Sequence, residues 1–186
     1  NERGWFGDPA FTLKDLPSGR NVFAGVPFVV HEFATSPVPT VIMLGGSGVP
    51  GNLPEAVADI PVGRKAAALF FLHTARVDTP IHDWERRDNK RFEVCRYVVR
   101  YADGKTEEVP IYLGEDIEDF KQRSPVPLPG AQIAWTKPYA GTEFSAVVYA
   151  KQWNNPRPDA VIASVDLVYG SDRRAVPALI AVTAAR

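Results

Sequence analysis

Prolines and glycines are the feature of this chain that most limits its fold. The 186 residues include 17 prolines and 14 glycines, which are spread along the chain without an internal repeat or a Ser/Gly linker. Proline removes a backbone N–H donor and breaks helices, and glycine marks turns. Long helices are therefore excluded, and the apolar runs between the turn residues have the length of strands.

The runs between the turns carry the patterns of β-strands. Residues 66–75 are apolar on both faces, which predicts a central strand that is covered on both sides. Residues 92–101 alternate between the two faces and lead into Asp103-Gly104, a hairpin signal, with a return strand over residues 107–113. Further strands are predicted over residues 20–30, 40–44, 144–152, 160–169 and 176–183.

About eight to ten strands in one chain predict an all-β fold, a single antiparallel two-sheet β-sandwich of the jelly-roll type. One or two short helices are expected, over residues 55–59 and 116–122. The Pro-rich segment 124–129 is expected to form an extended connection across the sandwich. Residues 1–186 are expected to form one domain, in which residues 1–15 can form an N-terminal extension.

Composition argues against several classes of function. The formal net charge is −1, which gives no electrostatic footprint for nucleic acid. No apolar run approaches the roughly 18 residues that cross a bilayer, so membrane insertion is not expected. The single cysteine, Cys95, excludes an intrachain disulfide framework and a multi-cysteine zinc site. Its place in an alternating strand predicts a buried thiol.

Sequence motifs of catalysis are missing. The chain contains no G-x-S-x-G elbow, H-E-x-x-H pair, P-loop or G-x-G-x-x-G turn, so no catalytic residue is assigned. A lyase or hydrolase is the less favoured interpretation, because it requires Arg76, His73, Tyr97 or acidic groups to converge in one cleft. The strand pattern instead places His73 on the packed face of Leu69 and Phe71.

Two short segments have the composition of a sugar-binding surface. An aromatic face covers the C–H patch of a sugar ring, while amide, carboxylate and guanidinium groups pair with its hydroxyls. One segment is the polar loop over residues 79–89, and the other is the end of a late strand. A solvated loop and core-filling indoles are the alternative interpretation. The predicted ligand-binding residues are Trp84, Asp83, Arg86 and Asp88 in the loop, and Trp153, Asn154 and Asn155 at the strand end.

Several spaced motifs resemble those of a family of accessory domains. They are Leu16-Pro17-Ser18-Gly19, residues 23–28 (FAGVPF), residues 69–74 (LFFLHT), Tyr101-Ala102-Asp103-Gly104 and Asn155-Pro156-Arg157-Pro158. From about residue 16 to near its C-terminus, the chain is similar to galactose-binding-like, carbohydrate-binding-module-type β-sandwiches. Such domains are appended to bacterial glycoside hydrolases and polysaccharide lyases.

The resemblance implies a non-catalytic carbohydrate-binding or accessory module of an exported bacterial polysaccharide-processing protein. Such a module would be secreted, periplasmic or on the cell surface. Its partners would be a polysaccharide or oligosaccharide and other domains of the same parent chain. The resemblance requires no cofactor but allows a structural calcium. A structural spacer, or a protein-docking sandwich without a ligand, is the alternative.

Overall fold

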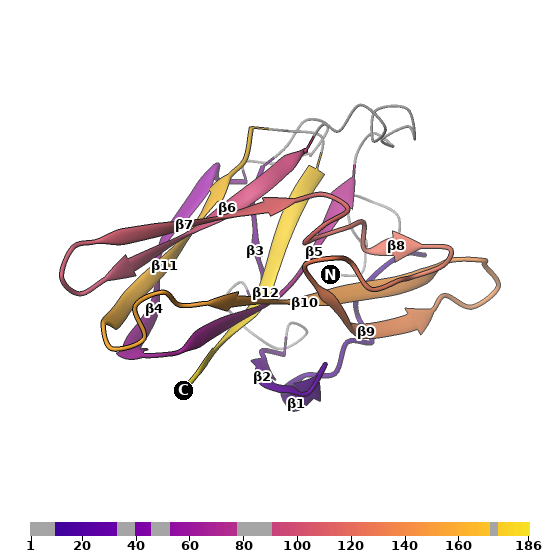
Figure 1. The fold of residues 1–186 in the computed structure, drawn as a ribbon. Coiled ribbons are helices and arrows are strands. Elements are labelled where there is room, and N and C mark those ends of the chain that lie inside the picture. The colour runs from indigo at the N-terminus through magenta and orange to yellow at the C-terminus, as the bar shows by residue number, and fades with distance from the viewer. Residues whose placement is uncertain (1–9, 33–39, 46–52, 78–90, 172–174) are drawn as a thin grey trace.

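The computed structural model describes residues 10–32, 40–45, 53–77, 91–171 and 175–186. Two antiparallel sheets pack against each other, and a two-stranded hairpin lies against the outer side of the larger sheet (Figure 1). The two-sheet β-sandwich predicted from the sequence is thereby confirmed.

The smaller sheet contains the predicted Asp-Gly hairpin. Gly104 has a φ of +84°, and the Lys105 N–H donates a hydrogen bond to Asp103 Oδ1 at 3.2 Å. Glycine adopts this left-handed conformation without the steric cost that a Cβ brings. The four strands, in spatial order, are β4 (Ala56–Lys65), β11 (Val161–Tyr169), β6 (Glu93–Tyr101) and β7 (Thr106–Tyr112).

The larger sheet has β5 at its centre. This strand pairs with β12 along one side and with β10 along the other. The sheet order is β3 (Ile42–Met43), β12 (Ala175–Ala185), β5 (Ala68–Val77), β10 (Ser145–Asn154) and β8 (Lys121–Gln122), with β9 (Gln132–Pro138) also paired to β10.

Both faces of β5 are buried, as its sequence predicts. Phe71 faces the smaller sheet and stacks on Tyr97 of β6, with the ring centroids 3.8 Å apart. Leu72 points the opposite way and packs in a second apolar cluster with Phe28. Phe28 belongs to the outer hairpin of β1 (Gly19–Phe23) and β2 (Val26–Val30). The fold is therefore a sandwich with a third, local layer.

The expected short helices are not found, and the described residues contain no helix. Residues 56–59 are the first residues of β4, which pairs with β11. Residues 116–122 form turns and bridges: the Ala75 N–H donates to Glu118 O at 3.1 Å, and the Phe120 N–H donates to Ala75 O at 2.7 Å. A helix this short is marginal alone, so the backbone bonds to β5 prevail over the local preference.

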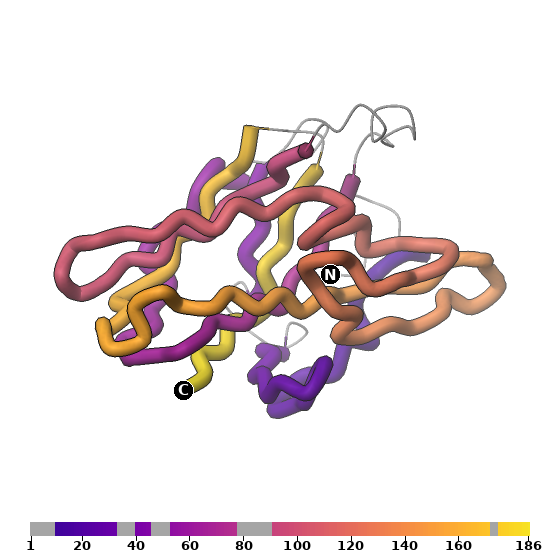
Figure 2. The backbone as a smooth tube through the Cα atoms, viewed as in Figure 1, coloured from indigo at the N-terminus to yellow at the C-terminus, as the bar shows by residue number. Residues whose placement is uncertain are grey.

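The Pro-rich segment 124–129 crosses over one sheet and does not pass between the two. It connects β8 with β9, which lie on opposite sides of β10. The Tyr149 hydroxyl of β10 donates to Val126 O at 3.4 Å, and Leu128 packs against the cluster that contains Tyr149. The segment thus covers part of β10 that has no strand of the smaller sheet above it (Figure 2).

Adjacent residues of β2 provide a test of the third layer. Phe28 is 1% exposed, whereas Val29 is 51% exposed. We expect Phe28→Ala to lower the free energy of unfolding by about 3–4 kcal/mol, because it empties the space against Leu72. Val29→Ala should cost about 1 kcal/mol or less. Urea denaturation followed by circular dichroism measures both values, and equally small losses would show that the hairpin does not stabilise the sandwich.

Candidate functional site

The two segments predicted to bind a ligand start from opposite ends of β5. Asn154 pairs with Ala68 at the first residue of this strand, whereas residues 79–89, which the sequence predicts as a loop, come after its last residue, Val77. At about 3.3 Å per residue, a strand of 10 residues separates its ends by about 30 Å. Trp84, Asp83, Arg86 and Asp88 lie outside the described residues.

Each end of β5 lies beside residues that are distant from one another in the sequence. The loop end comprises Val77, Arg91 and residues 112–119. The turn end comprises residues 64–67, residues 153–159 and Arg186, which meet where β4, β10 and β12 finish (Figure 1).

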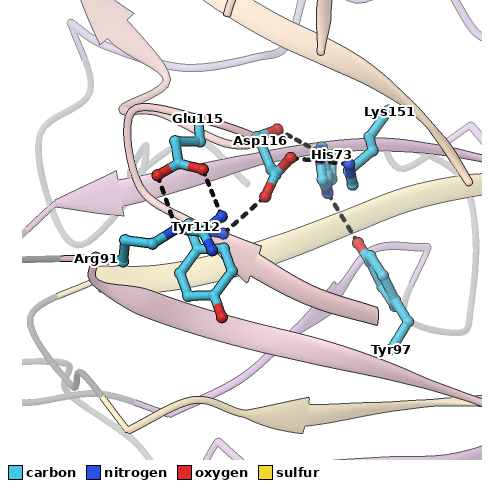
Figure 3. A network of polar contacts seen from close by, with 7 residues as sticks. All are labelled: His73, Arg91, Tyr97, Tyr112, Glu115, Asp116 and Lys151. Carbon is cyan, nitrogen blue, oxygen red and sulfur yellow. Dashed lines mark hydrogen bonds and ion pairs between the residues drawn. The ribbon is translucent and has the colours of Figure 1, made fainter. Parts of the chain in front are cut away.

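At the loop end, Arg91 is fixed in position. Its guanidinium Nε and Nη2 donate to the two carboxylate oxygens of Glu115 at 2.9 and 2.6 Å. The same guanidinium lies 3.7 Å from the centre of the Tyr112 ring (Figure 3). A bidentate ion pair and a stacked ring together limit the freedom of this exposed side chain.

On the other side of the predicted loop, Val77 is also fixed. Its N–H donates to Asp119 Oδ2 at 2.8 Å, and the Lys121 N–H donates to Asp119 Oδ1 at 2.7 Å. Burial raises the pKa of Asp119 to about 6, although both backbone donors favour the carboxylate. Val77 and Arg91, which flank the loop in sequence, are thus both held by residues 115–119.

His73 lies between the two sheets. Its Nδ1 is 2.9 Å from the Tyr97 hydroxyl, and its Nε2 is 3.0 Å from the backbone carbonyl of Asp116 (Figure 3). A carbonyl only accepts, so Nε2 carries the proton and Nδ1 accepts from the Tyr97 hydroxyl. Burial lowers the pKa of His73 to about 4, against the opposing effect of Asp116. His73 is therefore a packed, neutral histidine, as the strand pattern predicts.

Asp116 connects this histidine to a second buried contact. Its Oδ1 forms an ion pair with Lys151 Nζ at 2.8 Å, where both side chains are largely buried, and its Oδ2 accepts the Tyr112 N–H at 3.1 Å. His73, Tyr97, Asp116 and Lys151 thus converge, which is one condition for catalysis. Neither of the two surface hollows described below is lined by any of them. These polar atoms are bound to one another in the interior, so the network stabilises the packing of the sheets.

The turn end separates two of the residues predicted to act together. Trp153 is half-buried and packs against the core cluster between the two sheets, which contains Phe71 and Tyr97. The next side chain, Asn154, is exposed, and its Oδ1 accepts a hydrogen bond from Gln152 Nε2 at 2.6 Å. Successive residues of a strand point to opposite faces, so Gln152 and Asn154 share the face that Trp153 does not.

The side-chain amide of Asn155 forms all of its hydrogen bonds with other groups of this chain. Its Oδ1 accepts from the Tyr101 hydroxyl at 2.5 Å and from the Arg157 N–H at 2.9 Å. Its Nδ2 donates to Ala66 O at 2.8 Å and to Arg157 O at 3.0 Å. These four bonds fill the bonding capacity of an asparagine side chain. Asn155 therefore joins β6, the β4–β5 turn and the β10–β11 turn, and keeps no free amide group for a ligand.

Two shallow hollows lie on the surface. One of about 450 Å³ lies beside the loop end, between Gly114, Glu118 and the segment of residues 122–129. The other, of about 550 Å³, lies at the turn end. Sequence reasoning missed this second hollow, because its cationic residues come from opposite parts of the sequence and only the adjacent pair Arg64-Lys65 gave a local signal. It is lined by Arg64, Lys65, Ala66, Ala67, Pro158 and Arg186.

The buried carboxylates do not fit a calcium site. Asp116 and Asp119 accept contacts at both oxygens, as described above. Asp166 accepts the Asp59 N–H at 2.9 Å and Arg100 Nε at 2.7 Å. Although burial opposes it, the Arg100 bond lowers the pKa of Asp166. Within the described ranges, no group of three His, Cys, Asp or Glu residues is placed to hold a metal ion. Calcium binding stays a prediction from the resemblance alone.

Cys95 is buried, as its position in β6 predicts. Burial raises the pKa of its thiol, with a smaller effect from Glu93. The thiolate that would act as a nucleophile is therefore disfavoured.

No family model matches this chain, and no curated protein matches it either. The resemblance to carbohydrate-binding-module-type domains therefore stays a prediction. Across the part of the chain that the structure describes, no helix has the length and apolar character needed to cross a membrane.

The buried state of His73 predicts a loss of stability in acid. The imidazole binds a proton near pH 6.5 in the unfolded chain but only near pH 4 in the folded one. Between these values the unfolded state binds more protons. The stabilising contribution of His73 is thus fully present above about pH 6.5 and is lost as the pH falls through 4. The loss amounts to about 3 kcal/mol.

Urea denaturation of the wild type and of His73→Gln at pH 7, 5.5 and 4.5 measures this contribution. We expect the wild type to lose more stability than the variant over this range. Asp119 acts in the opposite direction, because its contribution is present below about pH 3.8 and is lost as the pH rises through about 6. The contribution of Asp119 is present in the wild type and in His73→Gln, so it cancels in the difference between their free energies of unfolding. If the difference in free energy of unfolding between the two proteins does not change with pH, the burial of a neutral His73 is contradicted.

Proposed function

We propose that this chain is a non-catalytic carbohydrate-binding or accessory module of an exported bacterial polysaccharide-processing protein. The observation that carries the proposal is the position of Trp153 at the turn end. Its indole is partly fixed by the core and partly accessible, on a strand end that Asn155 holds in place. An aromatic surface that is already rigid loses little conformational entropy when a sugar ring stacks on it.

Binding through such a surface would be weak at each site. The hollows of the described surface are shallow and exclude water poorly, so little area is desolvated on binding. Useful affinity would come from tethering to other domains of the parent chain, which raises the effective concentration of the module at its substrate.

The loop over residues 79–89 is the second proposed binding segment. Its composition places Trp84 among Asp83, Arg86 and Asp88. The fixed positions of Val77 and Arg91 support this proposal, because a loop that starts and ends on rigid elements presents its side chains with less loss of entropy.

A specific observation also favours the alternative, a protein-docking sandwich. Val22 and Val29, on the outer hairpin, are 70% and 51% exposed. Val22 pairs with Pro27 and Val29 pairs with Arg20, so these residues share the outward face of β1 and β2. An exposed apolar face of this kind is typical of a contact surface for another domain.

Affinity electrophoresis on a panel of plant, algal and host polysaccharides tests the main proposal. We expect at least one polymer to retard the folded chain, and Trp153→Phe to weaken that retardation by about 3- to 10-fold, because a smaller ring covers less of the sugar. Trp84→Ala should weaken it similarly if the loop takes part.

Trp135→Phe is the matched control. Trp135 of β9 is also half-buried but packs in the second apolar cluster, away from the turn end. Its substitution should leave the retardation unchanged. A folded chain that no polysaccharide retards would contradict sugar binding and leave the docking alternative in its place.

A further inference from the structure

We propose that the turn end binds an anionic sugar unit, one that carries a carboxylate or sulfate group, through Arg64, Lys65 and Arg186. This inference rests on the proposed function and names the class of polysaccharide. These three residues line the hollow of about 550 Å³ together with Ala66, Ala67 and Pro158.

These three cations differ in their partners from seven other cations of the described residues. None of the three forms an ion pair with a carboxylate of the described residues. Ion pairs do occupy Arg91, Arg96, Arg100, Arg123, Lys137, Lys151 and Arg157. Unpaired cations that meet at one hollow leave their charge available to an incoming anion.

The nearby acidic side chains do not cancel this charge. Asp103, at the tip of the β6–β7 hairpin, is held by Arg157 Nη2 at 2.5 Å. Asp159 belongs to the neighbouring turn but does not line the hollow. The local charge of the hollow is therefore positive although the formal net charge of the chain is −1.

The chain holds the floor of the hollow in place before any ligand arrives. The Asn155 Nδ2 donates to Ala66 O, and the Asn155 N–H donates to Ala67 O, both at 2.8 Å. The Ala67 N–H donates to Ala185 O at 2.7 Å, which fixes the strand end that carries Arg186. Lys65 and Arg64 pair with Val161 and Ile162 of β11. The β4–β5 turn, the β10–β11 turn and the end of β12 are distant in sequence but form one rigid site. This rigidity lowers the entropic cost of binding.

The combination of charge and floor favours a sugar acid or sulfated sugar over a free inorganic ion. An arginine guanidinium matches the planar fork of a carboxylate or the oxygens of a sulfate. The exposed methyl group of Ala67 and the ring of Pro158 offer an apolar surface for the C–H face of a sugar, which an inorganic ion does not need. The volume lies within the range of small-molecule sites, and the lining contains no aromatic ring on which a nucleobase could stack.

The test compares the full chain with two double variants by affinity electrophoresis. The polymers are polygalacturonate, dextran sulfate, a neutral galactan and single-stranded DNA. Arg64→Gln/Lys65→Gln removes two charges of the hollow. Lys14→Gln/Arg20→Gln removes two charges of exposed residues elsewhere and is the matched control.

We expect polygalacturonate or dextran sulfate to retard the wild type, and the hollow variant to bind that polymer at least about 10-fold more weakly. The control variant should change by less than about 2-fold, and salt should weaken the binding. The comparison of the two polymers shows whether the anion is a carboxylate or a sulfate.

Retardation by the galactan alone would overturn the anionic site and leave the proposed function standing. An equal loss of affinity in both double variants would overturn the site as well. Binding of DNA as strong as that of the acidic polysaccharides would also overturn it. Either result indicates non-specific electrostatic attraction without a defined site. If no polymer retards the folded chain, both the site and the proposed function are wrong.

Discussion

The burial of β5 on both faces is the constraint on which the rest of the structure depends. Phe71 on one face is buried against the smaller sheet, and Leu72 on the other face is buried against the outer hairpin. The burial of apolar area drives folding, so this strand requires a layer on each side. Its length then separates the loop end from the turn end, and no binding surface can use the face of the strand itself.

Polar and charged side chains have different roles in the interior and on the surface. His73, Tyr97, Asp116 and Lys151 converge between the sheets, yet each is bound to a partner inside the chain. A buried polar group without a partner is costly, which is why these contacts are complete. Arg64, Lys65 and Arg186 also gather, but they line an open hollow and have no acidic partner among the described residues. Exposure and unused charge, more than convergence alone, distinguish a candidate binding site from a structural network.

Asn155 links the fold to the candidate site. The sequence places it in a sugar-binding pattern beside Trp153, but the structure shows its amide bound to Tyr101, Ala66 and Arg157. By holding the β4–β5 turn, it positions the floor between Arg64 and Arg186. Its effect on a ligand would therefore be indirect, through the shape of the turn end, while the side chains that touch the ligand are supplied by its neighbours.

Local patterns in the sequence determined most of the strands, the Asp103-Gly104 hairpin, the double burial of β5 and the buried Cys95, because alternation and left-handed glycine turns are encoded within a few residues. They did not predict β4 or β9. The tertiary structure decided what depends on register between distant segments. It replaced the short helix expected at residues 116–122 with bonds to β5, and it brought Arg64 beside Arg186. These outcomes depend on which strand lies next to which, and no window of neighbouring residues contains that information.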